Sequence, residues 1–430
     1  MSKRFDRRCY NHHVRSPIPA RWVAISVFIF ASVLNYLDRQ ILATMVDIWR
    51  TRPEFPFTYG DYGLLLAVFS IAYAVSALFV GAFIDRVGLN RGAAWAVAVW
   101  AVASFGTGAS HSVRELLVWR ALLGVSEASA IAAVTKAIAM YLLPPERAVG
   151  QAMSQLGLSL GAGIAPAFAV YFSDRYSWHW AFYAAGILSL AWIPMWLATS
   201  RAIPAVALPR TGKQAHSFAL LRDPKLWALI VANMLGMTVY SLWANWAPTY
   251  LIHVHRLTPE QASHYTWIVP TSGYFGGLLG GVISWRLVRS GRTPIAARKL
   301  ACLVSALFLL GTMAVPFAPN PALATLGMSL SYFWACAWSV NHYTLPIDLY
   351  GARRAAFSAS ALVFAYGVMQ SVVSRPLASV IERYGFGWIC FTFALLPLAG
   401  YLLVHRAVRD ESGHGAFPQS QLTEKAASTC

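Results

Sequence analysis

Charged side chains are scarce in this chain, and acidic ones are the scarcest. Only 12% of the 430 residues are Asp, Glu, Lys or Arg, whereas 57% are hydrophobic. Soluble globular domains carry about 25% charged residues, so an ordinary water-exposed surface is excluded. Crossing the hydrocarbon layer of a bilayer takes about 20 apolar residues per helix, and such runs recur along the chain. The composition therefore predicts an integral membrane protein.

Alternation of apolar and polar residues at period two is absent, which excludes a transmembrane barrel and leaves helices as the spanning elements. We expect an all-α membrane protein with about twelve transmembrane helices. The first apolar run is too long for a cleavable signal and should remain as the first helix. The predicted spans are Trp22–Val46, Tyr62–Ile84, Ala93–Ser110, Val113–Met140, Ala148–Phe172, Trp180–Thr199, Leu226–Ile252, Tyr265–Val288, Leu300–Pro316, Ala322–Leu345, Ala355–Val380 and Phe386–Val404.

Motifs of catalysis and of metal binding are also missing. The sequence has no nucleophile elbow, no HExxH, no phosphate-binding loop and no cluster of acids suited to a metal. The cysteines are odd in number and lack metal-ligand spacing, so we interpret them as packing or tail residues. They are Cys9, Cys302, Cys336, Cys390 and Cys430. We expect neither an enzyme nor a cofactor.

The net charge of +17 is compatible with nucleic-acid binding, but its distribution favours a membrane topology. Basic residues gather on one side of the predicted helices, for example in the N-terminal stretch 3–8 and in the stretch 286–299 after the eighth span. Such an excess is typical of cytoplasmic loops. We therefore expect both termini in the cytoplasm of a bacterial-type inner membrane, a lipid bilayer as the surroundings, and no nucleic-acid partner.

The chain divides near its middle. The longest inner connection, 200–225, contains Pro204, Pro209 and Gly212, which is linker composition. We expect a monomer with two helical bundles. The predicted segments are an N-tail 1–21, an N-terminal six-helix bundle 22–199, the linker 200–225, a C-terminal six-helix bundle 226–405 and a C-tail 406–430.

A short motif occurs once in each half. Residues 81–91 follow the second span, residues 281–292 follow the eighth, and glycine and arginine recur in both at matching offsets. Repeated halves with a site between them are typical of secondary transporters. The first copy resembles the signature loop of the major facilitator superfamily, at Gly81, Asp85, Arg86, Gly88 and Arg91.

This resemblance implies a cytoplasmic latch, in which Asp85 and Arg86 hold neighbouring helix ends in one conformation and release them in the other. A solvated turn is the alternative. In the second copy Trp285 replaces the acid, so a latch there should be weak or absent.

A narrower resemblance covers most of the chain. The chain is similar to the anion:cation symporter branch of that superfamily, especially to its hexuronate and aldonate carriers. The segments that carry the similarity are Asn35–Arg39, Arg120–Ala128 with Lys136 and Pro145–Arg147 beyond it, and Trp243–Leu251.

Several ionisable residues fall inside predicted spans, where a central charge costs roughly 2.5–3.5 kcal/mol. Asp38 and Arg120 should lie about 6 and 10 Å outside the midplane, so a salt bridge between them is geometrically reasonable. Lys136 lies near the inner boundary, where snorkelling to lipid headgroups is the alternative to a functional role. For Arg375 both substrate contact and snorkelling stay open.

Glu127 and Arg39 are the candidates for ion chemistry. Glu127 lies near mid-membrane, and a buried carboxyl without a fixed cationic partner can exchange protons near neutral pH. Arg39 lies about 100° around its helix from Asp38 and can face a central cavity, where its planar fork suits a carboxylate. Tyr36 shares this face, and Tyr73 lies on a stripe of the second helix; for each, packing is the alternative.

The C-terminal half supplies amide and phenol groups suited to hydroxylated substrates. Packing between membrane helices is the alternative for each. The candidates are Tyr240, Asn245, Tyr274, Asn341, His342, Tyr366 and Gln370.

The family resemblance implies specific roles for these residues. The residue at the position of Arg39 holds the substrate carboxylate, the pair Asp38 and Arg120 couples helices, and Glu127 takes a proton. We therefore expect a secondary transporter that imports a small organic anion, such as a hexuronate or aldonate, with protons. A carrier of aromatic or other carboxylates, or a proton-driven exporter, is the alternative.

Overall fold

In the computed structural model, residues 18–50, 57, 59–205, 217–257 and 259–408 are described, and their regular structure is helical throughout. The first bundle holds six long helical paths, one of them broken. Its elements are α2 (Ile18–Arg50), α3 (Tyr59–Val87), α4 (Leu89–Gly108), α5 (Val113–Glu127), α6 (Ser129–Tyr141), η1 (Pro144–Glu146), α7 (Arg147–Arg175) and α8 (Trp178–Ala202).

The second bundle follows the stretch 206–216, which is the middle of the predicted linker and lies outside the described residues, as do most of the predicted tails. Its elements are η2 (Ser217–Arg222), α9 (Pro224–Gly236), α10 (Thr238–His255), α11 (Pro259–Thr266), α12 (Ile268–Arg289), α13 (Pro294–Leu309), η3 (Leu310–Phe317), α14 (Pro321–Tyr350), α15 (Ala355–Tyr384) and α16 (Gly387–Ala407). Capped starts with proline in the first turn, after Asp223, Thr293 and Asn320, set where three of these helices begin.

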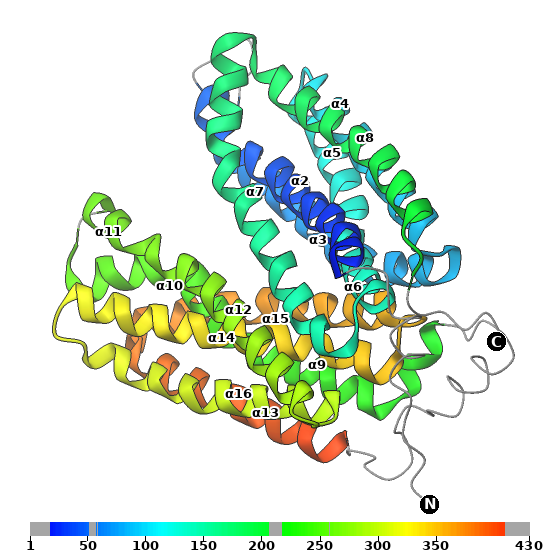
Figure 1. Cartoon of the computed structure of the whole chain (residues 1–430). Coiled ribbons are helices and arrows are strands. Elements are labelled where there is room, and N and C mark those ends of the chain that lie inside the picture. Colours follow the sequence, from blue (N-terminus) through cyan, green and yellow to red (C-terminus); the bar gives the residue numbers. More distant parts are fainter. Residues whose placement is uncertain (1–17, 51–56, 58, 206–216, 258, 409–430) are drawn as a thin grey trace, which may run out of the picture.

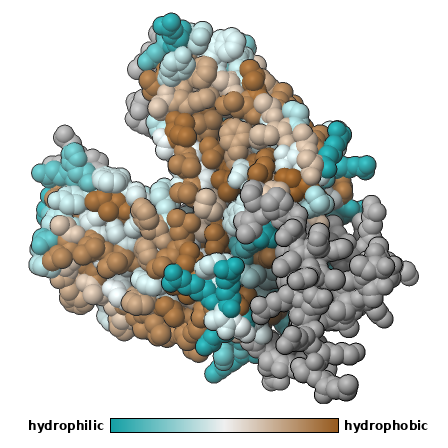
Figure 2. All heavy atoms as spheres, in the orientation of Figure 1, coloured by the Kyte–Doolittle hydropathy of each residue, from teal (hydrophilic) through white to brown (hydrophobic). Residues whose placement is uncertain are grey.

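The two bundles form a V (Figure 1). They are in contact where α15 packs on α3 and α6, and where α12 and α14 pack on α7. The start of α2 and the end of α16 lie toward this junction, which we call the closed end. The space-filling view shows a cleft between the bundles at the opposite, open end (Figure 2).

Nine helical segments among the described residues are long and apolar enough to cross a membrane. The remaining predicted spans are helices as well, namely α4, α12 and α15, but they do not meet the same apolar criterion. The all-helical prediction is therefore confirmed for the described residues, while the number of twelve spans stays a prediction.

Apolar side chains cover the outer faces of the bundles (Figure 2). More than half of the surface of each of Ile71, Phe79, Trp95, Val118 and Phe275 is exposed. A soluble monomer rarely exposes such a continuous apolar surface, whereas lipid chains cover one without cost.

Two predicted spans are broken near their middle. The fourth divides into α5 and α6 at Ala128, one residue after Glu127, and the Ser126 hydroxyl donates 3.0 Å hydrogen bonds to the carbonyls of Leu122 and Leu123. Back-bonding of this kind bends helices. The seventh divides into α9 and α10 at Met237, where Gly236 packs directly against the Trp338 ring. Both breaks lie beside the central cavity described below.

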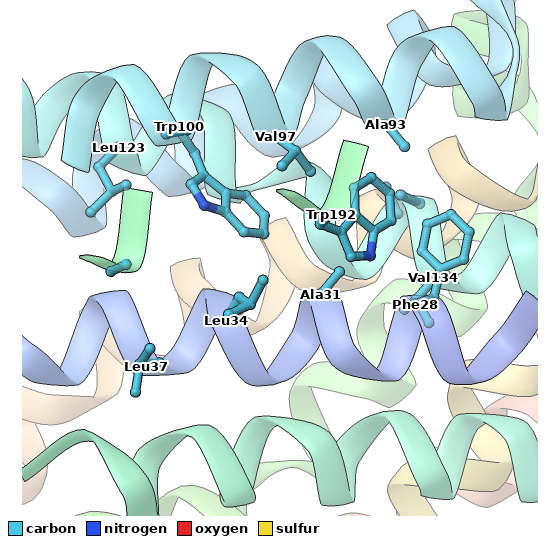
Figure 3. Packing of buried hydrophobic residues seen from close by; sticks show 14 of the residues in the cluster. Phe28, Ala31, Leu34, Leu37, Ala93, Val97, Trp100, Leu123, Val134 and Trp192 are labelled. Carbon is cyan, nitrogen blue, oxygen red and sulfur yellow. The ribbon is translucent and has the colours of Figure 1, made fainter. Parts of the chain in front are cut away.

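Buried tryptophans anchor the core of the first bundle (Figure 3). The Trp192 indole lies 5.5 Å from the Phe28 ring and donates to the Val27 carbonyl at 2.7 Å. Trp100 donates to the Ser189 hydroxyl at 2.7 Å. The indole N–H groups of Trp192 and Trp100 therefore both have a partner, and these contacts fix α2, α4 and α8 relative to one another.

Candidate functional site

A cavity of about 590 Å³ lies between the two bundles and receives side chains from both. The first bundle contributes Tyr36, Arg39 and Tyr73, and the second contributes Tyr240 and Gln370. These five residues were predicted from the sequence as substrate contacts. The volume lies within the range of about 300–1,000 Å³ that is usual for small-molecule sites.

Arg39 and Glu127 form an ion pair at the wall of this cavity. The Arg39 Nη2 atom lies 3.0 Å from Oε2 of Glu127, and Nε lies 3.3 Å from the same oxygen. The Arg39 side chain is 24% exposed, whereas the Glu127 side chain is fully buried behind it. The prediction that Glu127 lacks a cationic partner is therefore wrong. The other carboxylate oxygen, Oε1, has no hydrogen-bond partner among the described residues.

Three aromatic rings surround the Arg39 guanidinium. Its Cζ atom lies 4.8 Å from the centre of Tyr36, 4.7 Å from Phe69 and 5.0 Å from Tyr73. Cation–π contacts at this range stabilise a cation that is removed from water. Tyr36 and Tyr73 therefore contact the one charged group that the cavity presents among the described residues.

The predicted ion pair between Asp38 and Arg120 is not formed. Asp38 instead accepts a hydrogen bond from the Ser104 hydroxyl, and the Arg120 guanidinium lies 5.9 Å from the centre of the Phe182 ring. Both side chains are about 1% exposed, and Nε and Nη2 of Arg120 have no hydrogen-bond partner among the described residues. Arg120 remains within electrostatic range of Asp38 and Glu127.

Two predicted contact residues do not line the cavity. Asn341 is completely buried, and its amide donates to the carbonyls of Gly280 and Ala337 at 3.0 and 2.9 Å. Asn245 is exposed and donates to the Ser241 carbonyl at 2.8 Å. Both amides serve helix packing or local backbone contacts, so we omit them from the site. The side chain of Arg375 lies outside the described residues.

Sequence reasoning missed a polar stripe on α7 that faces the cavity. Gln151, Gln155 and Ser159 all line it, and the Gln155 amide donates to the Ser339 hydroxyl of the other bundle at 3.2 Å. Their spacing of four residues places them on one helix face. This spacing was the signal available in the sequence. Tyr332 and Tyr343 of α14 also line the cavity without having been predicted.

The predicted latch residue Asp85 joins the bundles at the closed end. Its carboxylate pairs with Lys136 at 2.7 Å and accepts a 2.9 Å hydrogen bond from the backbone N–H of Phe357, in the first turn of α15. Lys136 is therefore buried and does not snorkel to lipid headgroups. A carboxylate at this position also complements the dipole of α15.

The glycines of the same motif have geometric roles, whereas Arg86 and Arg91 are exposed. A Cβ atom at Gly81 would lie 2.9 Å from the Ala356 carbonyl, so glycine allows α3 and α15 to approach. Gly88 has a φ of +94°, a conformation that favours glycine, and it forms the turn from α3 to α4.

A second ion-pair cluster joins the bundles at the closed end. Trp285 stands at the position of the acid, and Asp348 of α14 supplies a carboxylate instead. Asp348 contacts Arg147 of the first bundle at 2.6 Å and Arg298 of its own bundle at 3.2 Å. Arg298 also donates to the Pro144 carbonyl at 2.5 Å. The bundles are therefore joined by an acid on this side too, but the acid comes from another helix and not from the second copy of the motif.

Two helical bundles that enclose a charged cavity and meet at one end are typical of secondary transporters. The family model described as Major Facilitator Superfamily matches residues 28–374. The chain therefore belongs to the major facilitator superfamily and is a multi-pass membrane transporter. Because members of this superfamily are transporters, the prediction that the chain is not an enzyme is confirmed.

Known relatives and solved structures agree with this assignment. The chain is 23% identical over 410 residues to the hexuronate transporter of Escherichia coli K12, with 91% of this chain and 94% of the relative covered. It is 24% identical over 411 residues to the D-galactonate transporter of Escherichia coli O6:H1, covering 89% and 94%. The outward conformation of the transporter FucP superposes with a TM-score of 0.71 at 14% identity, covering 92% of this chain and 99% of that one. The predicted resemblance to hexuronate and aldonate carriers is thereby confirmed.

Proposed function

We propose that this protein imports a small organic anion, such as a hexuronate or aldonate, together with protons by alternating access. The relatives that carry sugar acids support an anionic cargo of this kind. Arg39 supports it independently, because a guanidinium that faces an aromatic-lined cavity suits a carboxylate.

The ion pair of Arg39 with Glu127 is the observation that carries this proposal. Arg39 faces the cavity, and Glu127 lies behind it with no exposed surface. A substrate carboxylate and the Glu127 carboxylate therefore compete for one guanidinium. Protonation of Glu127 removes its charge and frees the guanidinium for the substrate, so proton and anion bind together. Loss of that proton on the other side restores the internal pair and displaces the substrate.

Contacts at the closed end control the conformational change in the proposed transport cycle. Asp85 and Asp348 each hold the bundles together there, while the cleft between the bundles opens at the opposite end (Figure 2). Inward opening requires both contacts to break. The exposed Arg286 and Arg289 lie in the last turn of α12, a helix that contacts η1 and α7 of the first bundle. Basic residues at this helix end support a cytoplasmic closed end and cytoplasmic termini in a bacterial-type inner membrane.

Uptake into liposomes tests the proposal. With D-galactonate or D-galacturonate supplied outside purified, reconstituted protein, we expect the outer medium to become more alkaline. Glu127→Gln should abolish accumulation driven by a proton gradient and retain substrate exchange. The matched control is Glu115→Gln, since Glu115 is an exposed carboxylate on the same helix. Unchanged accumulation in Glu127→Gln, with no pH change on substrate addition, would contradict proton coupling.

A further inference from the structure

We infer that the cavity accepts monocarboxylates and rejects dicarboxylates of the same carbon skeleton. This inference rests on the proposed function and narrows its substrate class. The inference depends on the number of charged side chains that line the cavity. Among the described residues, Arg39 is the one cavity-lining side chain that is charged at neutral pH.

The wall opposite Arg39 is polar but neutral. It comes from the second bundle and offers phenol, hydroxyl and amide groups, namely Tyr240, Tyr274, Tyr332, Ser339, Tyr366 and Gln370. Two of these phenol rings, Tyr240 and Tyr332, stack with their centres 4.8 Å apart. Such groups hydrogen-bond hydroxyls well, since a phenol or an amide both donates and accepts.

A second carboxylate would find no cation at that wall. Ionised groups lose much more hydration energy than hydroxyls on entering such a cavity, and only a charged partner compensates the loss. Arg39 cannot serve both ends of a dicarboxylate, because its guanidinium is fixed on α2 between Tyr36, Phe69 and Tyr73. Protonation of Glu127 also frees a single positive charge, which balances a single carboxylate.

Size does not make the distinction. A cavity of about 590 Å³ is large enough for a six-carbon acid, whether its far end is a hydroxymethyl group or a carboxylate. The selection predicted here is therefore electrostatic, and a neutral group of equal or greater bulk at the far end should be accepted.

Competition binding to the reconstituted protein at pH 7 tests the inference with matched probes. One pair is D-galactonate and galactarate, which differ in the second carboxylate. The other set is benzoate, terephthalate and monomethyl terephthalate, in which the ester is bulkier than the diacid but carries one charge. We expect each dicarboxylate to bind at least tenfold more weakly than its monocarboxylate. We expect the monomethyl ester to recover most of the affinity lost in terephthalate.

A charge-adding variant provides the reverse test. Gln370→Lys places a second cation on the neutral wall and should improve galactarate binding relative to D-galactonate by at least fivefold. Gln261→Lys adds the same charge on the exposed surface of α11, outside the cavity, and should leave the ratio unchanged. The ester comparison uses the unmodified protein, so the test does not depend on the folding of a variant.

The outcomes separate this inference from the proposed function. Equal affinity for mono- and dicarboxylates, or a monomethyl ester as weak as terephthalate, would overturn the charge-count inference and leave anion transport intact. Absence of binding for all five probes would overturn both.

Discussion

The two bundles share a fold but differ in the chemistry that they present at the cavity. Among the described residues, Arg39 is the one charged side chain that lines the cavity, and it belongs to the first bundle together with its buried partner Glu127. The second bundle presents neutral phenols and amides, such as Tyr240 and Gln370. The comparison teaches that, under the proposed function, ion coupling belongs to the first half and recognition of the substrate body to the second.

The closed end shows a second asymmetry between the halves. Asp85 closes one side from the repeated motif, whereas Asp348 closes the other from a different helix and holds two arginines. Sequence repetition alone therefore does not guarantee equal function in the two copies, because an equivalent contact can be built from residues outside the motif.

Breaking the ion pair from one side should have the largest effect on stability. Arg39→Ala leaves the fully buried Glu127 without its cation, which costs about 3–5 kcal/mol when the carboxylate is ionised. The loss should be smaller at pH 5 than at pH 8, since a protonated Glu127 needs no cation. Adding Glu127→Gln should recover much of the stability. Thermal unfolding of the single and double variants in detergent measures both effects; additive losses would contradict the pairing.

Loss of Arg39 should also weaken substrate binding strongly, and this is the second-largest effect that we expect. We expect Arg39→Ala to weaken binding of D-galactonate by roughly 100-fold, or about 2.7 kcal/mol, because a charge-assisted, two-oxygen contact is lost. Arg39→Lys should be intermediate, since lysine keeps the charge but not the fork. Arg114→Ala is the control, because Arg114 is exposed on α5. Retained affinity in Arg39→Ala would remove the carboxylate role.

Removing the acids that join the bundles at the closed end should shift the conformational equilibrium by an intermediate amount. Asp348→Asn leaves Arg147 and Arg298 without their carboxylate, so we expect it to favour inward opening by about 1–3 kcal/mol. Asp85→Asn should shift the equilibrium in the same direction by less, because the contact of Asp85 with the second bundle is one hydrogen bond from the Phe357 backbone N–H, which a neutral amide accepts less strongly. Spin-label distances across the open end measure the shift. Asp174→Asn, on an exposed residue of α7, should leave it unchanged.

Substitutions at the neutral cavity wall of the second bundle should have the smallest effects on transport. Tyr240→Phe removes one phenol hydroxyl from the cavity and should raise the KM for D-galactonate about threefold to tenfold, the equivalent of one hydrogen bond. Benzoate, which has no hydroxyls, should be affected less if it is carried. Asn245→Ala should have no effect on either, because Asn245 does not line the cavity. An equal effect of both variants would argue against the division between the halves.

Much of the fold and part of the site were predictable from the sequence. Apolar runs defined the spans, and the residues Tyr36, Arg39, Tyr73, Tyr240 and Gln370 were correctly assigned to a central cavity. The assignment worked because helical periodicity fixes which residues share a face.

The pairing of charges was not predictable in the same way. The periodicity of one helix does not determine its rotation relative to a neighbour. The predicted partner of Asp38 is therefore Arg120, whereas in the structure the Ser104 hydroxyl of α4 donates a hydrogen bond to the Asp38 carboxylate. Asn341 was likewise assigned to the cavity although it packs against Gly280 of α12. A sequence does not specify the hydrogen-bond partner of a buried polar side chain. The partner depends on which helix packs beside it.

The sequence by itself determined that this protein lies in a membrane, that it folds as helices in two related halves, and that most of the ionisable residues within its spans belong to the first half. These properties follow from composition and local periodicity, which act through burial of apolar surface and backbone hydrogen bonding. The tertiary structure decided that Glu127 pairs with Arg39, and that Asp348 replaces the missing acid of the second motif. Contacts between helices distant in sequence depend on packing angles and rotations, which no single segment encodes.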